Sequence, residues 1–227
     1  MEGPSEIRAV SDAIEDLVDT VVARDEALAE LKNRAARDPL TGLANRATLD
    51  EFLAGGGGRG RPFAFACVDL DGFKAVNDGH GHAAGDAVLR QVAERLGSCV
   101  RGGDMVIRNG GDEFVAILEM PQPTRGGPVL RVGSRIVEEI AEPFAIDGAE
   151  VRIGASVGVA FYPQDADDPQ QVLLYADQAL YRAKRAGRRR VEVFNDQASP
   201  ATTERRRPLT ISRGRGRSPG RPPEARR

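Results

Sequence analysis

The chain has 227 residues, of which 41% are hydrophobic and 29% charged, a composition typical of a water-soluble globular protein. No apolar run approaches the roughly 20 residues of a membrane span, so we expect a cytoplasmic protein without a transmembrane segment. Aromatic residues make up only 5% of the chain, which argues against base stacking and so against specific nucleic-acid binding. Cys67 and Cys99 lack metal-ligand spacing, and we interpret them as buried hydrophobic residues.

Charge is distributed unevenly along the chain. Residues 201–227 carry nine Arg and two Glu, a net charge of +7, which leaves −9 for the rest of the chain. The Arg/Gly/Pro/Ser composition beyond about residue 197 cannot support a packed core, so we predict a disordered basic tail over residues 197–227. Such an acidic body repels phosphate groups, so a protein of this charge that binds phosphates needs bound cations to offset the repulsion.

Residues 6–34 predict one helix. Its apolar residues recur at alternating steps of three and four, with Arg24 as the interruption: Ile7, Val10, Ile14, Leu17, Val21, Leu28 and Leu31. This narrow heptad stripe, with charged residues on the other faces, favours a two-stranded coiled coil over an amphipathic helix packed on its own domain. We therefore predict a homodimer joined through an N-terminal signalling helix at residues 1–35.

A turn is predicted after this helix, because Pro39 disfavours helical backbone at Asp38 and Gly42 permits a sharp bend. Asn45 can cap a short helix that runs to about Leu53. The glycine-rich stretch at residues 55–61 lacks the Gly-Lys-Ser/Thr ending of a phosphate-binding loop, so we predict a flexible connection there.

Residues 63–68 form a nearly continuous apolar run, which predicts a central buried strand. The run ends in Asp69-Leu70-Asp71, so two carboxylates lie on the same side of the strand end. A glycine- and histidine-rich turn at residues 79–82 precedes a helix predicted from about Gly85 to Leu96.

Residues 105–118 predict a β-hairpin, because two apolar, β-branched runs flank Asn109-Gly110-Gly111-Asp112. Asn-Gly is a strong hairpin signal, since both central positions tolerate φ > 0. The glycines also let a ligand approach the backbone closely. Asp112 and Glu113 are consecutive, so on a strand we expect them to point to opposite faces. Taken alone, the stretch is equally compatible with an ordinary exposed turn.

The remaining predicted elements are a Pro/Gly-rich loop at 119–128, a helix at about 129–141, a long strand at 151–161, a helix from Pro169 to Gly187 and a closing strand at 191–194. Lys184 and Arg188 are four residues apart and are expected to share a helical face. Acids from two strand ends beside such cations predict metal-assisted phosphoryl or nucleotidyl transfer. Ordinary surface ion pairs are the alternative.

Eight motifs, in order, closely resemble the GGDEF family of diguanylate cyclases: Asp38 to Arg46, Asp69 to Lys74, Asn77-Asp78, Gly81-His82, Gly85-Asp86, Gly110 to Phe114, Ser156 to Gly158 and Ala179 to Arg188. The resemblance implies a catalytic domain at residues 36–196 with a palm-like α+β fold, ferredoxin-like and nucleotide-cyclase-like, whose mostly antiparallel sheet is flanked by helices. It also implies condensation of two GTP into cyclic di-GMP and two pyrophosphates, with one GTP bound to each subunit of a homodimer.

The resemblance further implies roles for individual residues. Asp69, Asp112 and the Leu70 carbonyl correspond to ligands of Mg²⁺ or Mn²⁺, and Asp112 and Lys74 to catalytic residues, with Asp112 activating the attacking hydroxyl. The implied substrate-binding residues hold phosphates (Lys74, Lys184, Arg188), lie along the hairpin backbone (Gly110, Gly111) or read guanine (Asn77, His82, Asp86). Phe73 and Glu113 are expected to support the site. Asp86 suits guanine because a carboxylate accepts from both N1–H and the 2-amino group.

Arg101-Gly102-Gly103-Asp104 resembles the inhibitory product site of the same family, which implies cyclic di-GMP as both product and inhibitor, held by Arg101, Asp104 and Arg135. Two positions depart from the family pattern: Asn109 replaces an aromatic residue, and Arg189 stands where Asn is frequent. A non-catalytic module that senses cyclic di-GMP is the alternative function, and a dimerisation fragment a third. The intact Gly-Gly-Asp-Glu-Phe run argues against the sensor.

Overall fold

The computed structural model describes residues 4–123, 125–146 and 148–195. The elements, in order, are α1 (Pro4–Ala35), β1 (Ala44–Asn45), α2 (Arg46–Ala54), the 3-10 helix η1 (Gly58–Gly60), β2 (Phe63–Asp71), α3 (Phe73–Cys99), β3 (Met105–Gly110), β4 (Glu113–Glu119), α4 (Pro128–Ala141), β5 (Phe144–Ile146), β6 (Ala149–Val151), β7 (Gly154–Tyr162), α5 (Pro169–Arg185) and β8 (Val191–Val193). The predicted disordered tail at 197–227 lies outside the described residues.

A six-stranded sheet in the order β1-β3-β4-β2-β7-β8 forms the centre of the fold. The pairs β2–β4, β2–β7 and β3–β4 are antiparallel, whereas the edge strands β1 and β8 join in parallel. The predicted mostly antiparallel sheet is therefore confirmed. Strand β2 lies inside the sheet, and residues 63–68 are all buried, as their continuous apolar run predicts.

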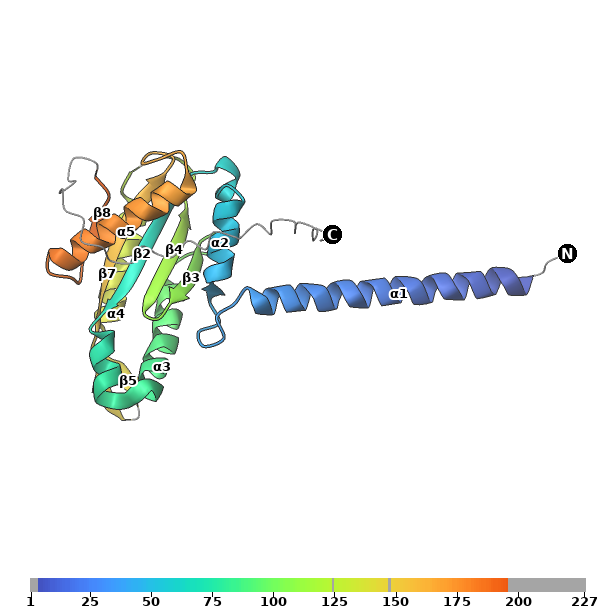
Figure 1. Cartoon of the computed structure of the whole chain (residues 1–227), viewed down its shortest axis with the longest axis horizontal. Helices are drawn as coiled ribbons and strands as arrows, with labels where there is room; N and C mark the ends of the chain where they lie inside the picture. The colour runs from blue at the N-terminus through green and yellow to red at the C-terminus, as the bar shows by residue number, and fades with distance from the viewer. Residues whose placement is uncertain (1–3, 124, 147, 196–227) are drawn as a thin grey trace, which may run out of the picture.

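Helices cover both faces of the sheet (Figure 1). Alternate residues of β2 divide between the faces: Ala64, Ala66 and Val68 join the cluster beneath α3 and α4, and Phe63 and Phe65 join the cluster beneath α2 and α5. The cysteines are free and buried, one in each cluster, as expected. Burying a side chain such as Phe65 contributes roughly 1.5–3 kcal/mol to folding.

Helix α5 packs directly on the backbone of β7 at Gly158. A Cβ at this position would lie 2.0 Å from the Leu180 nitrogen and 2.2 Å from the Ala176 carbonyl oxygen. The side chain must be absent here because its neighbours are backbone atoms that cannot rotate away. This contact sets the distance between the helix and the sheet, and so the height of the helix end above the ends of β2 and β4.

Three predicted segments differ from the structure. Most of the strand predicted at 151–161 is β7, which starts only at Gly154, whereas Val151 ends β6, a strand that follows the turn at Gly148 (φ +82°) and pairs with β5 in a separate two-stranded sheet. Helix α3 begins at Phe73, and the turn predicted at 79–82 is a kink at Gly81 with φ 82° and ψ 165°. The glycine stretch 55–61 contains η1 and packs closely, since a Cβ on Gly57 would lie 2.6 Å from Pro169.

Helix α1 extends away from the sheet and its covering helices (Figure 1). Its predicted stripe is exposed in a single copy, with Leu17 63% and Leu31 61% accessible. The side chains of Ile7, Val10 and Ile14 lie outside the described residues. The helix is thus confirmed, and its pairing with a second copy stays a prediction. Within the described ranges, no helix combines the length and the apolarity needed to cross a bilayer.

Candidate active site

Two acids face each other at one end of the sheet. Asp69 near the end of β2 is the register partner of Glu113 at the start of β4, so both side chains lie on the same face. Asp112 lies in the turn before β4, and its carbonyl accepts from the Leu70 N–H at 3.3 Å. The expectation that Asp112 and Glu113 point to opposite faces of one strand does not apply, because β4 starts only at Glu113 and Asp112 lies in the turn before it.

The Lys184 ammonium on α5 forms a salt bridge with the Asp69 carboxylate, and both side chains are largely buried. Burial raises the pKa of Asp69; Lys184 opposes this shift, and the charges of Asp112 and Glu113 add to it. The structure therefore brings together a strand-end acid, the hairpin acids and a cation of the last helix, as the sequence indicated.

Asp177 is a fourth acid that sequence reasoning missed. Burial raises its pKa; Glu113 adds to the shift, Lys184 opposes it, and Asp69 adds to it as well. Asp177 lies two helical turns before Lys184, between the buried Leu173 and Leu180. A carboxylate on the apolar stripe of an amphipathic helix was the signal that could have found it.

The hairpin tip is made by its two glycines, with φ 140° at Gly110 and 55° at Gly111. Asn109, expected to adopt positive φ, instead lies in β3 and is buried. Its Oδ1 accepts from Arg46 at 3.1 Å, and its Nδ2 donates to Glu113 Oε2 at 3.1 Å. The Asn109 amide thus orients the Glu113 carboxylate. An aromatic residue at this position would have no amide group to make these two hydrogen bonds.

Arg108 ties the hairpin tip to the turn that follows α1. Its guanidinium donates to the Gly111 carbonyl at 3.1 and 2.9 Å and to the Asp38 carboxylate at 3.0 and 3.2 Å. Burial raises the pKa of Asp38, but hydrogen bonds from Thr41 and Arg108 outweigh it and hold this pKa below its usual value. Hydrogen bonds through Arg108 therefore connect the glycine tip to the Asp38 turn.

The expected guanine-reading residues come from the two halves of α3. A Cβ on Gly85 would lie 2.0 Å from Asn77 Oδ1 and 3.3 Å from the Phe73 ring, so the Asn77 amide rests directly on Gly85, beside Asp86. Phe73 is buried and supports this contact. Lys74, His82 and Asp86 are exposed to solvent. Their roles stay predictions.

Arg188 does not share a helical face with Lys184, because α5 ends at Arg185 and Arg188 has φ 64°. Its Nε lies 3.7 Å from Asp71 Oδ1. The two strand-end acids therefore each have one cation: Lys184 contacts Asp69, and Arg188 faces Asp71. The prediction placed both cations near the acids correctly but gave the wrong reason for Arg188.

The Arg101–Asp104 turn precedes β3 at the far end of the sheet. The Asp104 carboxylate, only 4% exposed, accepts from the Arg101 and Glu119 backbone N–H groups at 3.1 and 2.9 Å. The Arg101 guanidinium contacts the Glu119 carbonyl and is 62% exposed. Arg135 lies on α4, where its Nε is 3.9 Å from Glu139 Oε1, and more than half of its side chain is exposed. Asp104 thus shapes the turn, and Arg101 faces outward.

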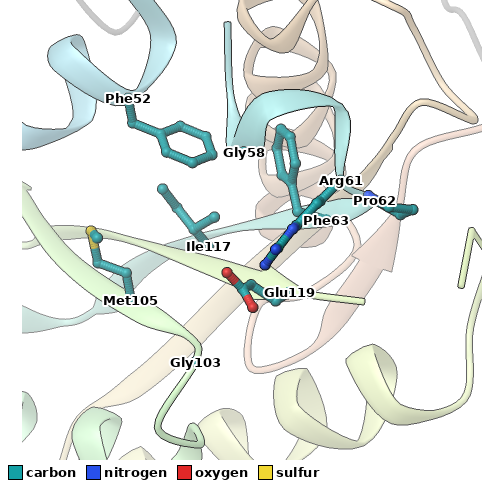
Figure 2. A pocket seen from close by; sticks show the side chains of 9 residues that line it. All are labelled: Phe52, Gly58, Arg61, Pro62, Phe63, Gly103, Met105, Ile117 and Glu119. Carbon is teal, nitrogen blue, oxygen red and sulfur yellow. The ribbon is translucent and has the colours of Figure 1, made fainter. Parts of the chain in front are cut away.

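A pocket of about 60 Å³ adjoins this turn and is lined by Phe52, Gly58, Arg61, Pro62, Phe63, Gly103, Met105, Ile117 and Glu119. Figure 2 shows the Arg61 and Glu119 side chains pointing toward each other at its edge. Phe63 pairs with Glu119 at one end of the β2–β4 ladder, and Asp69 pairs with Glu113 at the other. The pocket and the acid cluster are therefore at opposite ends of the sheet.

Residues 35–190 match the family described as diguanylate cyclase, GGDEF domain. The chain belongs to this family. Its GGDEF domain is 42% identical over 163 residues to the bifunctional diguanylate cyclase/cyclic di-GMP phosphodiesterase MucR of Pseudomonas aeruginosa, covering 70% of this chain and 23% of MucR. It is 39% identical over 175 residues to diguanylate cyclase TpbB of the same species, covering 74% of this chain and 40% of TpbB.

The chain also resembles a solved structure, the coiled coil and GGDEF domain of DgcB from Caulobacter crescentus in complex with c-di-GMP. The two chains superpose with a TM-score of 0.69 at 29% sequence identity. The match covers 82% of this chain and 99% of the DgcB chain. The chain spans less than half the length of the two curated relatives.

Proposed function

We propose that the protein is a diguanylate cyclase that condenses two GTP molecules into cyclic di-GMP and two pyrophosphates. The observation that carries the proposal is the acid cluster of Asp69, Glu113 and Asp112 beside the side-chain-free tip at Gly110 and Gly111. A nucleotide can lie against this backbone while its phosphates approach the acids through a bound cation. The family membership of residues 35–190 supports the same reaction.

The donor set fits a hard divalent ion, Mg²⁺ or Mn²⁺. Asp69, Asp112 and the Leu70 carbonyl would hold it, and the position of Glu113 opposite Asp69 adds a further oxygen donor. An oxygen donor set suits a hard cation such as Mg²⁺, which is commonly held by carboxylates together with substrate phosphates and water. When bound, the ion neutralises phosphate charge.

The protein's own groups bind and orient the nucleotide. Lys74, Lys184 and Arg188 offset the negative charge that builds up around phosphorus. Asn77, resting on Gly85, and the exposed Asp86 read the guanine edge, with His82 on the same bend. Asp112 accepts the proton of the 3′-hydroxyl that attacks the α-phosphorus of the second GTP.

The second GTP comes from a second copy of the chain, because each copy carries one set of these residues. The exposed apolar stripe of α1 supports parallel pairing of two copies, and the related DgcB structure contains a coiled coil next to its GGDEF domain. GTP is a cytoplasmic nucleotide, so we place the reaction in the cytoplasm.

The decisive experiment incubates the full chain with GTP and Mg²⁺ or Mn²⁺ and measures cyclic di-GMP and pyrophosphate. We expect two pyrophosphates for each cyclic di-GMP, loss of product with EDTA, and a fall of at least about a hundredfold for Asp112→Ala, since both a metal ligand and the proton acceptor are removed. Binding of cyclic di-GMP by a dimer that makes no product from GTP would instead support the sensor alternative.

Product inhibition through Arg101, Asp104 and Arg135 is part of the proposal. The exposed Arg101 guanidinium supports it, because this group can form paired hydrogen bonds with guanine or phosphate. We expect Arg101→Ala to weaken cyclic di-GMP binding at least about tenfold in calorimetry and to relieve inhibition without changing the KM for GTP. Unchanged product affinity would remove Arg101 from this role.

A further inference from the structure

Asp71, the second acid at the end of β2, makes contacts that the proposed reaction does not use. Its side chain is 7% exposed. Its two oxygens accept from the Ser156 hydroxyl at 3.0 and 2.9 Å, and Oδ2 also accepts from the Arg189 backbone N–H at 3.1 Å. Ser156, on β7, is fully buried. These contacts connect the end of β2 to the turn that follows α5.

That turn has an unfavourable backbone conformation. Arg188 and Arg189 are consecutive residues with φ 64° and 49°, the left-handed region that penalises a Cβ and is adopted most readily by Gly and Asn. Such a conformation persists only where surrounding contacts impose it.

Contacts on both sides of Arg189 impose this conformation. The Arg188 N–H donates to the Ala183 carbonyl at 3.0 Å, and the Arg190 carbonyl accepts from the Val157 N–H at 2.9 Å. The Arg189 side chain lies over Gly154, where a Cβ would be 2.7 Å from its Cγ and Nε. Between these two backbone bonds, Asp71 is the side chain that accepts the Arg189 N–H.

We propose that Asp71 is a positioning residue: together with Ser156 it holds the Arg188–Arg189 turn in its left-handed conformation and so places the Arg188 guanidinium at the phosphates of GTP. The inference rests on the proposed GTP site. Arg188 lies 3.7 Å from Asp71 with 61% of its side chain exposed, so its guanidinium is steered by the acid and still open to an anion. Without Asp71 the turn relaxes and the guanidinium is no longer fixed near the site.

The first test compares Asp71→Ala and Asp71→Asn with the unsubstituted chain, measuring kcat, KM for GTP and the Kd of a non-hydrolysable GTP analogue. We expect Asp71→Ala to raise KM and this Kd roughly tenfold, with a much smaller change in kcat. Asp71→Asn keeps an oxygen acceptor for the Arg189 N–H and is expected to retain more of the affinity. An unchanged KM and Kd in Asp71→Ala would overturn the inference.

Asp165 provides a matched control for a purely structural effect. It is a buried acid at the opposite end of β7, where it accepts from the Phe161 backbone N–H at 2.6 Å and pairs with Arg125. Asp165→Ala is expected to lower thermal stability and leave the KM for GTP unchanged. An equal rise in KM in this variant would show that any loss of a buried acid has the effect, and would overturn the specific role of Asp71.

A second substitution tests the mechanism directly. Because Gly adopts positive φ without a Cβ penalty, the turn in Asp71→Ala/Arg189→Gly no longer depends on the acid. We expect the double variant to recover KM to within about threefold of the unsubstituted chain. A double variant as weak as Asp71→Ala would overturn the inference.

Amide hydrogen exchange separates this inference from the proposed function. We expect the Arg189 amide to exchange faster in Asp71→Ala than in the unsubstituted chain, whether or not GTP is turned over. Failure of the unsubstituted chain to make cyclic di-GMP would overturn the proposed function. A protected Arg189 amide in Asp71→Ala would overturn the anchoring role of Asp71.

Discussion

At the scale of single residues, the acid cluster carries more negative charge than its cation balances. Asp69 pairs with the Lys184 ammonium, and burial together with neighbouring carboxylates, Glu113 among them, raises the pKa of Asp69 and of Asp177. Without a bound cation, repulsion between these partly buried carboxylates lowers the free energy of unfolding. The surplus charge is what a divalent cation offsets, which is the physical reason for expecting metal-dependent substrate binding here.

The pH dependence of stability tests this charge excess at Asp177. Because folding raises the pKa of Asp177, stability decreases as pH rises from the unfolded-state pKa through the folded-state pKa, and remains lower above it. Asn does not titrate. In EDTA, Asp177→Asn should therefore melt at a higher temperature than the unsubstituted chain at about pH 8, and the difference should narrow toward about pH 4. A difference independent of pH would contradict the role of the carboxylate charge.

At the scale of elements, the contact of α5 with β7 determines where Lys184 stands. In Gly158→Ala, the new Cβ meets backbone atoms of Ala176 and Leu180, so the helix has to move off the strand. We expect the free energy of unfolding, measured by urea titration, to fall by roughly 3 kcal/mol or more, the upper end of the losses seen when a core is overpacked. Activity should fall as well. Gly97→Ala, within α3, is the control: its Cβ would meet nothing within 4 Å, and stability should stay equal or rise slightly.

Elements with a clear period were predictable from the sequence. The buried run at residues 63–68 and the helices α1, α2, α4 and α5 follow from apolar spacing, helped by the Asn45 cap, whose side chain accepts from the Thr48 N–H, and by Pro169 at the start of α5. The small sheet of β5 and β6 was not predicted, because apolar spacing does not reveal a chain reversal at Gly148. Boundaries that depend on a single glycine were the least predictable.

The candidate site was predictable as a set of residues and less so as a geometry. Asp69, Asp112 and Lys184 were found from motif and charge, and the structure brings them together. The orientation of Glu113 relative to Asp112 was not predictable, because it depends on the residue at which β4 starts. Asp177 was missed because its partners come from β2, β4 and its own helix, which are joined only by tertiary packing.

At the scale of the whole molecule, α1 is a helix of 32 residues, and the part of its apolar stripe with described side chains, Leu17 to Leu31, is exposed to solvent. Each buried Leu of a coiled-coil seam contributes about 1.5–3 kcal/mol, so if the chain forms the proposed dimer, Leu17→Glu/Leu28→Glu should convert it into monomers in analytical ultracentrifugation. Production of cyclic di-GMP should fall at least about tenfold while the affinity for a GTP analogue is kept, because only the meeting of two half-sites is lost.

Ala23→Glu/Ala29→Glu adds the same charge outside the seam and should leave both dimer and activity intact. A dimer that survives Leu17→Glu/Leu28→Glu would mean that the catalytic domains associate without α1.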